Sequence, residues 1–258
     1  MFTQLPAIGL GELVEAAGLQ TRVDRKYLVD RGDLSLLLAK SAEDLAVLEI
    51  EGSRRFSYES VYFDTPALAS YLAAARSRRR RFKVRTRTYM DSGQCMLEIK
   101  TRAREATVKR RFGYSAADRH RLTAEGRRRI EDSGAVPVRA GDLAPVMATR
   151  YLRATVLHRP SGTRMTFDTE LRFEGFDGST GALGTAVTVV ETKSPGRSGP
   201  IDRLLWEVGY RPCPISKYGT GMAFLNPDLP ANKWNRTLRR HFGWRPGARA
   251  AVQPALST

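Results

Sequence analysis

Four stretches of the chain alternate charged residues with apolar or β-branched ones. They lie at residues 81–87, 98–100, 164–170 and 191–193. Because successive side chains of a strand point to opposite faces of a sheet, this period of two predicts strands that carry their charges on one face. Most of these charges are cations, and like charges directly opposite one another on neighbouring strands cost roughly 0.2–1 kcal/mol per pair. We therefore expect something anionic to be held against the charged face.

The same patterns predict the remaining elements. Strands are expected at residues 23–29, 45–50, 56–63, 81–89, 95–101, 107–113, 147–158, 163–173 and 187–193, with residues 215–218 closing the core. Helices are expected at residues 9–18, at 33–40 with Asp33 as N-cap, at 65–75 with Pro66 at the first position, at 115–132 and at 199–209. Phe63 is expected in the core, and Asp64 is expected to hold the turn between strand and helix.

Many strands and few helices predict an α+β fold whose antiparallel sheet is large enough to close into a barrel. In an ordinary barrel the apolar face of the sheet looks inward. Here the charged face is too dense to be a random solvated surface, so the pattern predicts the reverse arrangement. We expect a barrel with a charged lumen and with helices packed over an apolar exterior.

Composition narrows the class of partner. The chain has 258 residues, is 41% hydrophobic and 9% aromatic, and carries a formal net charge of +16. The first two values are typical of a folded protein, and the charge predicts a polyanionic partner: nucleic acid, an anionic lipid surface or polyphosphate. Of the 43 basic residues only eight are lysines, and six of these fall in the strand-like segments. Where the chain keeps lysine, a compact point charge is favoured over the planar fork of arginine.

The cysteines and histidines exclude several kinds of site. Cys95 and Cys213 are the only cysteines, too few and too far apart for a disulfide framework or a zinc motif. The three histidines are dispersed. The N-terminal segment lacks the basic and long apolar parts of a secretory signal, and no apolar run approaches the ~20 residues that span a bilayer. We expect a soluble cytoplasmic protein.

Nine short motifs, in order along residues 23–225, resemble those of the VTC (vacuolar transporter chaperone) domain, a member of the triphosphate tunnel metalloenzymes related to the CYTH phosphatases. The motifs lie at residues 24–27, 61–65, 83–89, 97–100, 108–112, 150–153, 164–168, 190–193 and 216–218. The resemblance implies an eight-stranded antiparallel barrel whose lumen is a basic tunnel for triphosphate or polyphosphate. We expect three parts: a lead-in helix in residues 1–22, the tunnel domain at 23–225, and a basic tail at 226–258 that is partly disordered in its last ten residues.

The resemblance also implies the site residues. The cations that would line the tunnel and hold phosphate oxygens are Lys26, Arg85, Arg87, Lys100, Lys109, Arg153, Arg164 and Lys217. Tyr151 and Ser216 would add hydroxyl donors, and Lys193 would join them in binding substrate. Glu191 matches the carboxylate that binds a divalent metal, Mn²⁺ or Mg²⁺. Glu98 is either a second metal ligand or the ion-pair partner of a tunnel arginine.

One position departs from the hydrolytic branch of these proteins. That branch has a Glu-x-Glu-x-Lys pattern on the first strand, whereas here Asp24 precedes Lys26 and Arg22 stands in place of the earlier glutamate. The departure favours the VTC branch over a simple triphosphatase or adenylate cyclase.

Phosphoryl transfer requires positioning and neutralisation of charge more than covalent help, so these residue types suit it. The first hypothesis is a polyphosphate polymerase-like enzyme that moves the terminal phosphoryl group of a nucleoside triphosphate onto inorganic polyphosphate. The alternatives are a tripolyphosphate or nucleoside triphosphate hydrolase, a non-catalytic polyphosphate-binding module and a nucleic-acid binder. Eukaryotic VTC complexes move their product through membrane helices, so this chain either works in the cytosol or has a separate membrane partner.

Two further features keep two interpretations each. Lys83 suits either a tunnel mouth or simple exposure. The four arginines at residues 78–81 either form a solvated surface or attract a polyanion toward a tunnel entrance. Trp234 and Trp244 are expected to dock on the body of the protein.

Overall fold

The computed structural model describes residues 2–16, 23–103, 106–196 and 198–247. Arg22, the end of the expected lead-in helix and the last ten residues lie outside the described residues, so the expectations placed there are not addressed. Within the described part of the chain, no helix is long and apolar enough to cross a membrane.

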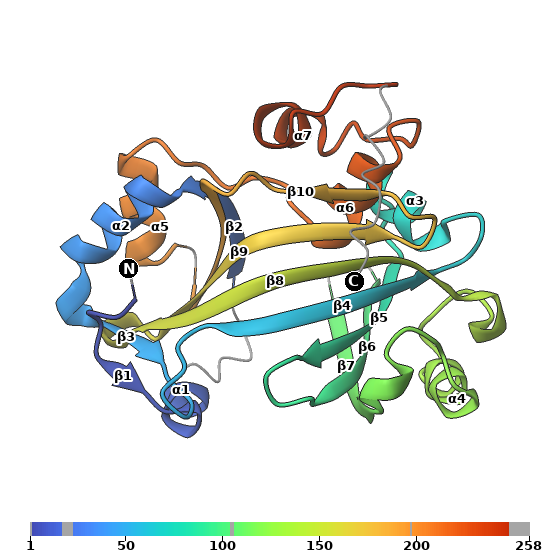
Figure 1. Ribbon diagram of the computed structural model, residues 1–258, viewed down its shortest axis with the longest axis horizontal. Helices are drawn as coiled ribbons and strands as arrows, with labels where there is room; N and C mark the ends of the chain where they lie inside the picture. The colour runs from blue at the N-terminus through green and yellow to red at the C-terminus, as the bar shows by residue number, and fades with distance from the viewer. Residues whose placement is uncertain (1, 17–22, 104–105, 197, 248–258) are drawn as a thin grey trace, which may run out of the picture. The chain divides into compact units, whose positions relative to one another are not determined.

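The fold is a mixed α+β arrangement with a large sheet (Figure 1). The strands are β1 (Ala7–Ile8), β2 (Val23–Asp30), β3 (Leu45–Leu48), β4 (Phe56–Asp64), β5 (Arg81–Tyr89), β6 (Cys95–Ala103), β7 (Ala106–Tyr114), β8 (Ala144–His158), β9 (Thr163–Gly175), β10 (Thr180–Ala182) and β11 (Val187–Ser194). The α-helices are α1 (Leu10–Ala16), α2 (Arg31–Lys40), α3 (Ala69–Ala75), α4 (Ala124–Asp132), α5 (Pro200–Glu207), α6 (Lys217–Leu225) and α7 (Asn235–Phe242). The nine strands expected from the sequence are therefore present.

The chain forms two compact units. Unit 1 comprises the residues up to Phe56, Tyr151–Glu170 and Leu183–Ile215, and unit 2 comprises Ser57–Arg150, Leu171–Ala182 and the residues from Ser216 on. Strands follow one another in the order β2-β11-β9-β8-β4-β5-β6-β7, and β8 and β9 run through both units. The end strands of this order are β2 and β7, and in the described residues they are not paired with each other. A large antiparallel sheet is thus confirmed, whereas its closure into a barrel is not.

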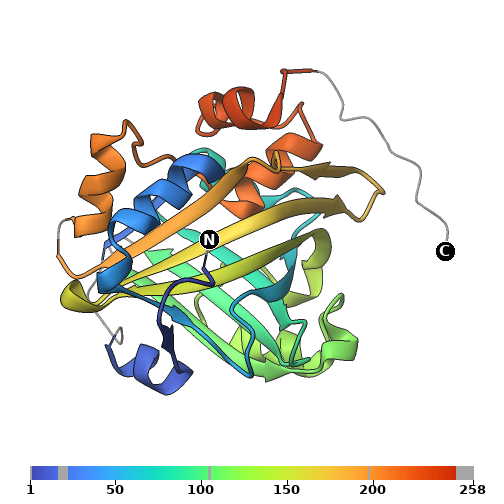
Figure 2. The ribbon, with the colours of Figure 1, turned by 60° about the vertical axis from the view of Figure 1, so that its left-hand side comes forward.

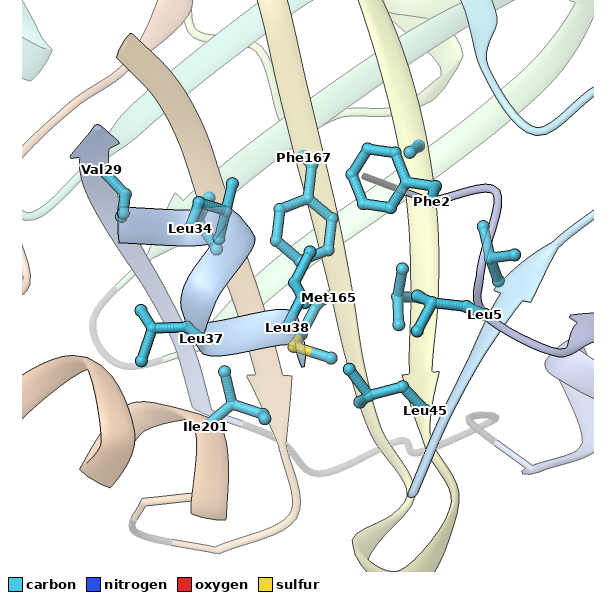
Figure 3. Packing of buried hydrophobic residues seen from close by; sticks show 14 of the residues in the cluster. Phe2, Leu5, Val29, Leu34, Leu37, Leu38, Leu45, Met165, Phe167 and Ile201 are labelled. Atoms are coloured by element: carbon cyan, nitrogen blue, oxygen red, sulfur yellow. The ribbon is translucent and has the colours of Figure 1, made fainter. Parts of the chain in front are cut away.

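In unit 1, alternation along the strands produces one apolar face. Tyr27, Val190 and Phe167 lie on it and are almost fully buried. Helices α2 and α5 cover this face. Figure 3 shows Leu34 and Leu38 of α2 turned toward the strand residues of the same cluster. Fully burying a large aliphatic or aromatic side chain contributes about 1.5–3 kcal/mol, so this cluster supplies much of the cohesion of unit 1.

In unit 2, the same alternation separates apolar from charged side chains on β5 and β6. Phe63, Val84 and Ile99 are buried in a cluster that also contains Ile130 of α4. Strands β5, β6 and β7 lie side by side in the views of Figures 1 and 2, in agreement with their pairing. The expectation that Phe63 belongs to the core is confirmed.

Helices α2 and α3 begin at other residues than expected. Helix α2 begins at Arg31, because the Asp30 side chain accepts a hydrogen bond from Gly32 N at 2.8 Å and acts as the N-cap in place of Asp33. Helix α3 begins at Ala69 because Leu68 adopts a left-handed conformation (φ 53°) that interrupts any helix starting at Thr65.

The expected helix at residues 115–132 is broken. A short 3-10 helix at Ala116–Asp118 is followed by α4, whose N-cap Thr123 accepts a hydrogen bond from Gly126 N at 3.1 Å. The segment expected to close the core at residues 215–218 does contribute two buried side chains, Ile215 and Tyr218, and it also starts a helix. Ser216 is the N-cap of α6 and accepts a hydrogen bond from Gly219 N at 3.2 Å, so Lys217 is the first helical residue. In both cases a hydroxyl cap overrides the pattern of neighbouring residues.

The region after residue 225 is more ordered than its composition indicates. Trp234 is almost fully buried, and Trp244 is buried with its indole N–H donating to the carbonyl oxygen of Ala223 at 3.1 Å. Both tryptophans dock on the body of unit 2, as expected. Helix α7 between them was not predicted, because its sequence is rich in arginine and short of apolar residues.

Candidate functional site

The charged face of β5, β6 and β7 in unit 2 carries cations in register. Antiparallel pairing places Lys83, Lys100 and Lys109 directly across from one another in one row. The next row consists of Arg85, Glu98 and Arg111. Over the four rows from Arg81 to Arg87, the described residues of this face provide eight cations and one carboxylate. Like charges in opposed positions destabilise a sheet, so this face favours a bound anion.

Glu98 is the centre of this arrangement. Its side chain is 3% exposed, and its carboxylate oxygens lie 2.7 Å from Arg85 Nε, 2.7 Å from Lys109 Nζ and 2.9 Å from Arg111 Nε. Burial by itself would raise the pKa of Glu98, but the charges of Arg85, Arg87 and Lys109 outweigh it and hold the pKa well below its usual range. Glu98 therefore stays ionised and orients the cations around it.

Lys109 has a lowered pKa in this arrangement. Burial lowers its pKa to about 7, because the attraction of Glu98 is offset by the neighbouring charges of Arg85 and Arg111. The side chain remains 35% exposed, so the burial responsible is partial. An incoming anion would favour the protonated ammonium group, which couples anion binding at this row to the protonation of Lys109.

Aromatic rings and a hydroxyl hold the lysine at the other end of this row. Lys83 Nζ donates to Ser216 Oγ at 3.2 Å and lies 5.7 Å from the ring centroids of both Tyr62 and Tyr218. The two tyrosine rings stack at 5.0 Å, and the Tyr218 hydroxyl donates to Asp64. Asp64 also accepts the backbone N–H of Ser70 at 2.9 Å, which confirms that it holds the turn into α3. Lys83 is thus positioned rather than simply solvated.

The charged face of unit 1 is built from β2, β11 and β9. Glu191 lies directly across from Lys26 on one side and Thr166 on the other, and Lys193 lies across from Asp24 and Arg164. In the three rows from Lys193 to Val189, the described residues provide three cations and three carboxylates, Asp168 being the third. This face is therefore close to neutral.

Glu191 is held by two ammonium groups. One carboxylate oxygen lies 2.8 Å from Lys26 Nζ, and the other accepts a hydrogen bond from Lys193, which also contacts Asp24 at 3.2 Å. The side chain is 16% exposed. Burial by itself would raise the pKa of Glu191, but Lys26 and Lys193 hold it well below its usual range. The carboxylate of Glu191 is therefore ionised at neutral pH.

Arg153 of β8 forms a bidentate pair with Asp168 in the same unit. The Nε–Oδ1 and Nη2–Oδ2 distances are 2.6 and 2.8 Å, and the guanidinium lies 5.3 Å from the ring centroid of Tyr151. Burial would lower the pKa of Arg153, but Asp168 outweighs it and holds the pKa well above its usual value. The two parallel hydrogen bonds to Asp168 fix the orientation of the Arg153 guanidinium group.

The expected site residues divide between the units. Unit 1 contains Lys26, Tyr151, Arg153, Arg164, Glu191 and Lys193, and unit 2 contains Arg85, Arg87, Glu98, Lys100, Lys109, Ser216 and Lys217. Among the residues not assigned from the sequence, Arg111 could have been found, because it continues the alternation from Lys109 toward the charged face. The tyrosines beside Lys83 gave no such signal, since their role depends on the position of α6.

The carboxylates decide where a divalent cation fits. No group of three or more histidine, cysteine, aspartate or glutamate side chains in the described residues could enclose a metal ion. Mg²⁺ is usually bound by one or two carboxylates together with water and substrate phosphates, so a single ionised glutamate is sufficient on the protein side. Both carboxylates already contact cations: Glu191 contacts two lysines, and Glu98 contacts three cationic side chains. Glu191 therefore has fewer competing cations, and it lies in the nearly neutral face.

Comparisons with known proteins bear on the family and the fold of the chain. The family model of the VTC domain matches residues 21–226, and no curated protein matches the chain. Among solved structures, a putative adenylyl cyclase from Hippeastrum, described as having a dominant triphosphatase activity, is 17% identical with a TM-score of 0.50. The match covers 83% of this chain and 100% of that chain. This likeness concerns the fold.

Two bacterial structures match less well. A putative adenylate cyclase from Bacillus halodurans is 11% identical with a TM-score of 0.45, over 72% of this chain and 87% of that chain. One from Vibrio parahaemolyticus is 14% identical with a TM-score of 0.41, over 73% and 87%. The family model, by contrast, spans both charged faces and most of the sheet. The chain therefore belongs to the VTC domain family.

Proposed function

We propose that this chain is a polyphosphate polymerase-like phosphotransferase, which moves the terminal phosphoryl group of a nucleoside triphosphate onto inorganic polyphosphate. The observation that supports this function best is the set of in-register cations on β5, β6 and β7, which surround one carboxylate. A surplus of positive charge in fixed positions suits a ligand with several negative charges in a line. The closed eight-stranded barrel with a charged lumen, implied by the family resemblance, stays part of this proposal.

Phosphoryl transfer between phosphate groups requires no covalent intermediate with the protein. Arginine forks bind phosphate oxygens in pairs, and lysines add point charges, so the ground state and the transferring phosphoryl group are both neutralised. The attacking group is a phosphate oxygen of the acceptor, so no cysteine or serine nucleophile is required. The thiols are poorly suited to that role: burial raises the pKa of Cys95 and raises that of Cys213 to about 11.

A divalent cation, Mn²⁺ or Mg²⁺, is part of the proposal. Glu191 would hold it, with the remaining ligands supplied by phosphate oxygens and water. When bound, the cation would offset the charge that develops on the transferring phosphoryl group. The two lysines that now contact Glu191 would then turn to the phosphates, since a phosphate oxygen competes with the carboxylate for the same ammonium groups.

Hydrolysis is the second candidate function, in which water replaces the phosphate acceptor. It is favoured by the dominant triphosphatase activity of the Hippeastrum protein, whose fold is similar. Against it stands Asp24, which pairs with Lys193 and belongs to a first strand without the acidic pair of the hydrolytic branch. A separate membrane partner would be needed only if the product leaves the compartment in which it is made.

The test is incubation of the full chain with ATP and Mn²⁺ or Mg²⁺, followed by analysis of phosphate chain length. Polyphosphate longer than the starting primer supports the polymerase, whereas free phosphate alone supports the hydrolase. If neither product forms while polyphosphate binds tightly, both enzymatic functions are rejected and a binding module remains. A preparation that carries Arg85→Gln and Arg87→Gln serves as the inactive control, because both cations lie on the charged face.

A further inference from the structure

Helix α7 and the turn that follows it carry an excess of positive charge away from both charged sheet faces. Arg236, Arg239 and Arg240 are exposed, and their spacing of three and four residues places them on one side of the helix. Arg245 follows in the turn and is also exposed. The chain contains no acidic residue between residues 229 and 247. We call these four arginines the α7 patch.

The opposite side of α7 is packed on unit 2. Leu238 is fully buried, and the ring of Phe242 lies 5.6 Å from that of Phe224 in α6 and 5.9 Å from that of Phe173 in β9. In Figures 1 and 2, α7 lies against α6 with its other side turned away from the body of unit 2. The apolar side chains of the helix are therefore used in packing, and the patch stands on a fixed support.

A concavity of about 560 Å³ lies at the C-terminal end of the helix. Its lining residues are Arg239, Gly243, Trp244, Arg245 and Pro246. Gly243 has a φ of 63°, the left-handed conformation that ends a helix and turns the chain back, so that Arg245 lines the same concavity as Arg239. Trp244 is fixed there by the hydrogen bond of its indole N–H to Ala223. Two cationic and two apolar side chains thus meet at one place, which suits a phosphate group attached to an apolar stem.

Helix α4 shows that arginines alone do not produce such a patch. It has three consecutive arginines, at residues 127–129, but also three acidic residues, Glu125, Glu131 and Asp132. Arg129 lies 3.1 Å from the carboxylate of Glu125. Helix α7 has as many arginines and no acidic residue to offset them. Its charge is therefore available to a partner from outside the chain.

We propose that the α7 patch binds an anionic lipid surface, with the concavity between Arg239 and Arg245 as the place of one headgroup phosphate. Clustered arginines are attracted to anionic lipids. Because the apolar side of α7 is packed on protein, the contact is peripheral and reversible rather than an insertion among acyl chains. Single-stranded nucleic acid is less suited to this surface, since its bases stack on exposed rings and Trp234 and Trp244 are buried.

This inference goes beyond the proposed function, because it concerns the surface at which the chain acts and not the reaction. The α7 patch follows the residues that the family domain covers, and it shares no residue with either charged sheet face. A contact through α7 would leave those faces free for phosphate ligands.

The test is co-sedimentation of the full chain with phosphatidylcholine vesicles, prepared with and without phosphatidylglycerol, in the absence of nucleotide and metal. The variant is Arg239→Gln with Arg245→Gln. The control is Arg127→Gln with Arg128→Gln, which removes the same charge from exposed positions of α4. We expect the wild type to bind only the vesicles that contain phosphatidylglycerol, the α7 variant to bind them about 30-fold more weakly, and the control to lose less than about threefold.

Three results would overturn the inference. If the α7 variant and the α4 control bind alike, the vesicles respond to net charge and not to this patch. If the wild type binds neither kind of vesicle, or binds both equally, no anionic lipid is recognised. A double-stranded oligonucleotide is the comparison ligand: if it binds the wild type while vesicles do not, and the α7 variant loses it, the patch belongs to nucleic acid.

The reaction in solution separates this inference from the proposed function. Formation of polyphosphate from ATP without vesicles is expected to be equal in the wild type, the α7 variant and the α4 control. A failed vesicle test therefore leaves the proposed function standing, and a failed product assay leaves the lipid contact standing.

Discussion

The charged face of unit 2 and the charged face of unit 1 have the same strand alternation but a different balance of charge. On β5, β6 and β7, eight cations share one carboxylate, and a row of three lysines has no carboxylate within it. On β2, β11 and β9, three cations meet three carboxylates. An excess of cations on a sheet face favours a bound anion that neutralises it. A face with equal numbers of cations and carboxylates is neutralised by its own ion pairs. Under the proposed function, we expect the face of unit 2 to supply most of the affinity for phosphate, and Glu191 of unit 1 to bind the cation.

The substitution Glu98→Gln tests most directly whether one carboxylate organises the cations of the unit 2 face. The substitution leaves Arg85, Lys109 and Arg111 without their shared counter-charge, and losing one partner of a buried ionic cluster costs about 3 kcal/mol. We expect the free energy of unfolding in urea to fall by about this amount, and added polyphosphate to restore much of it. The matched control is Glu125→Gln, whose exposed pair with Arg129 on α4 is worth less than about 0.5 kcal/mol. Equal losses in the two variants would show that Glu98 does not organise the face.

Glu191→Gln tests the other side of the comparison. Because the proposal assigns the divalent cation to Glu191, we expect the metal-dependent turnover of ATP to fall about 100-fold. The affinity for polyphosphate without metal should change much less, since unit 2 provides it. Glu207→Gln, an exposed carboxylate at the end of α5, is the control. Full metal-dependent turnover in Glu191→Gln would remove Glu191 from the proposal.

The protonation of Lys109 predicts a pH dependence. Its pKa of about 7 in the folded protein lies below the ordinary 10.5, so the positive charge of Lys109 is lost as pH rises through about 7. We expect the affinity for polyphosphate to fall by up to tenfold between pH 6 and pH 8.5, relative to a Lys109→Arg variant measured in parallel. The variant corrects for titration of the ligand itself. Parallel pH curves for the two proteins would contradict the assignment.

The lowered pKa of Lys109 also predicts how the free energy of unfolding depends on pH. Between about pH 7 and 10.5 the unfolded chain binds more protons at Lys109 than the folded one, so this group makes stability rise with pH over that window. The difference between wild type and Lys109→Arg in thermal unfolding at pH 7 and pH 9 measures it. No change in that difference would indicate that the lysine stays charged in the folded state.

The smallest expected effect is that of Tyr218→Phe. The substitution removes the hydroxyl that donates to Asp64 but keeps a ring beside Lys83. We expect a loss of about 1 kcal/mol in stability, since Asp64 retains its backbone donors, and less than a threefold change in polyphosphate affinity. Tyr218→Ala, which also removes the ring, should weaken phosphate binding further. If both variants bind alike, the rings do not position Lys83.

Much of the sheet could be predicted because strand alternation is a local property. The nine expected strands are present, and the division of β5 into a charged side and an apolar side with Phe82 and Val84 follows from the sequence pattern. Helix starts were less predictable. Asp30 and Ser216 act as caps through hydrogen bonds that compete with equally plausible neighbours, and Leu68 interrupts a stretch of good helix formers by its backbone conformation.

The sequence by itself determined which side chains share a strand face, the excess of positive charge on those faces, and the order of the family motifs. Only the tertiary structure decided which cation meets which carboxylate. Lys26 and Glu191 are far apart in the chain and become neighbours through the register of β2 and β11, while Glu98 meets Lys109 and Arg111 through the register of β6 and β7. The physical reason is that alternation sets the face of a residue, whereas charge balance depends on which strands pair and in what register.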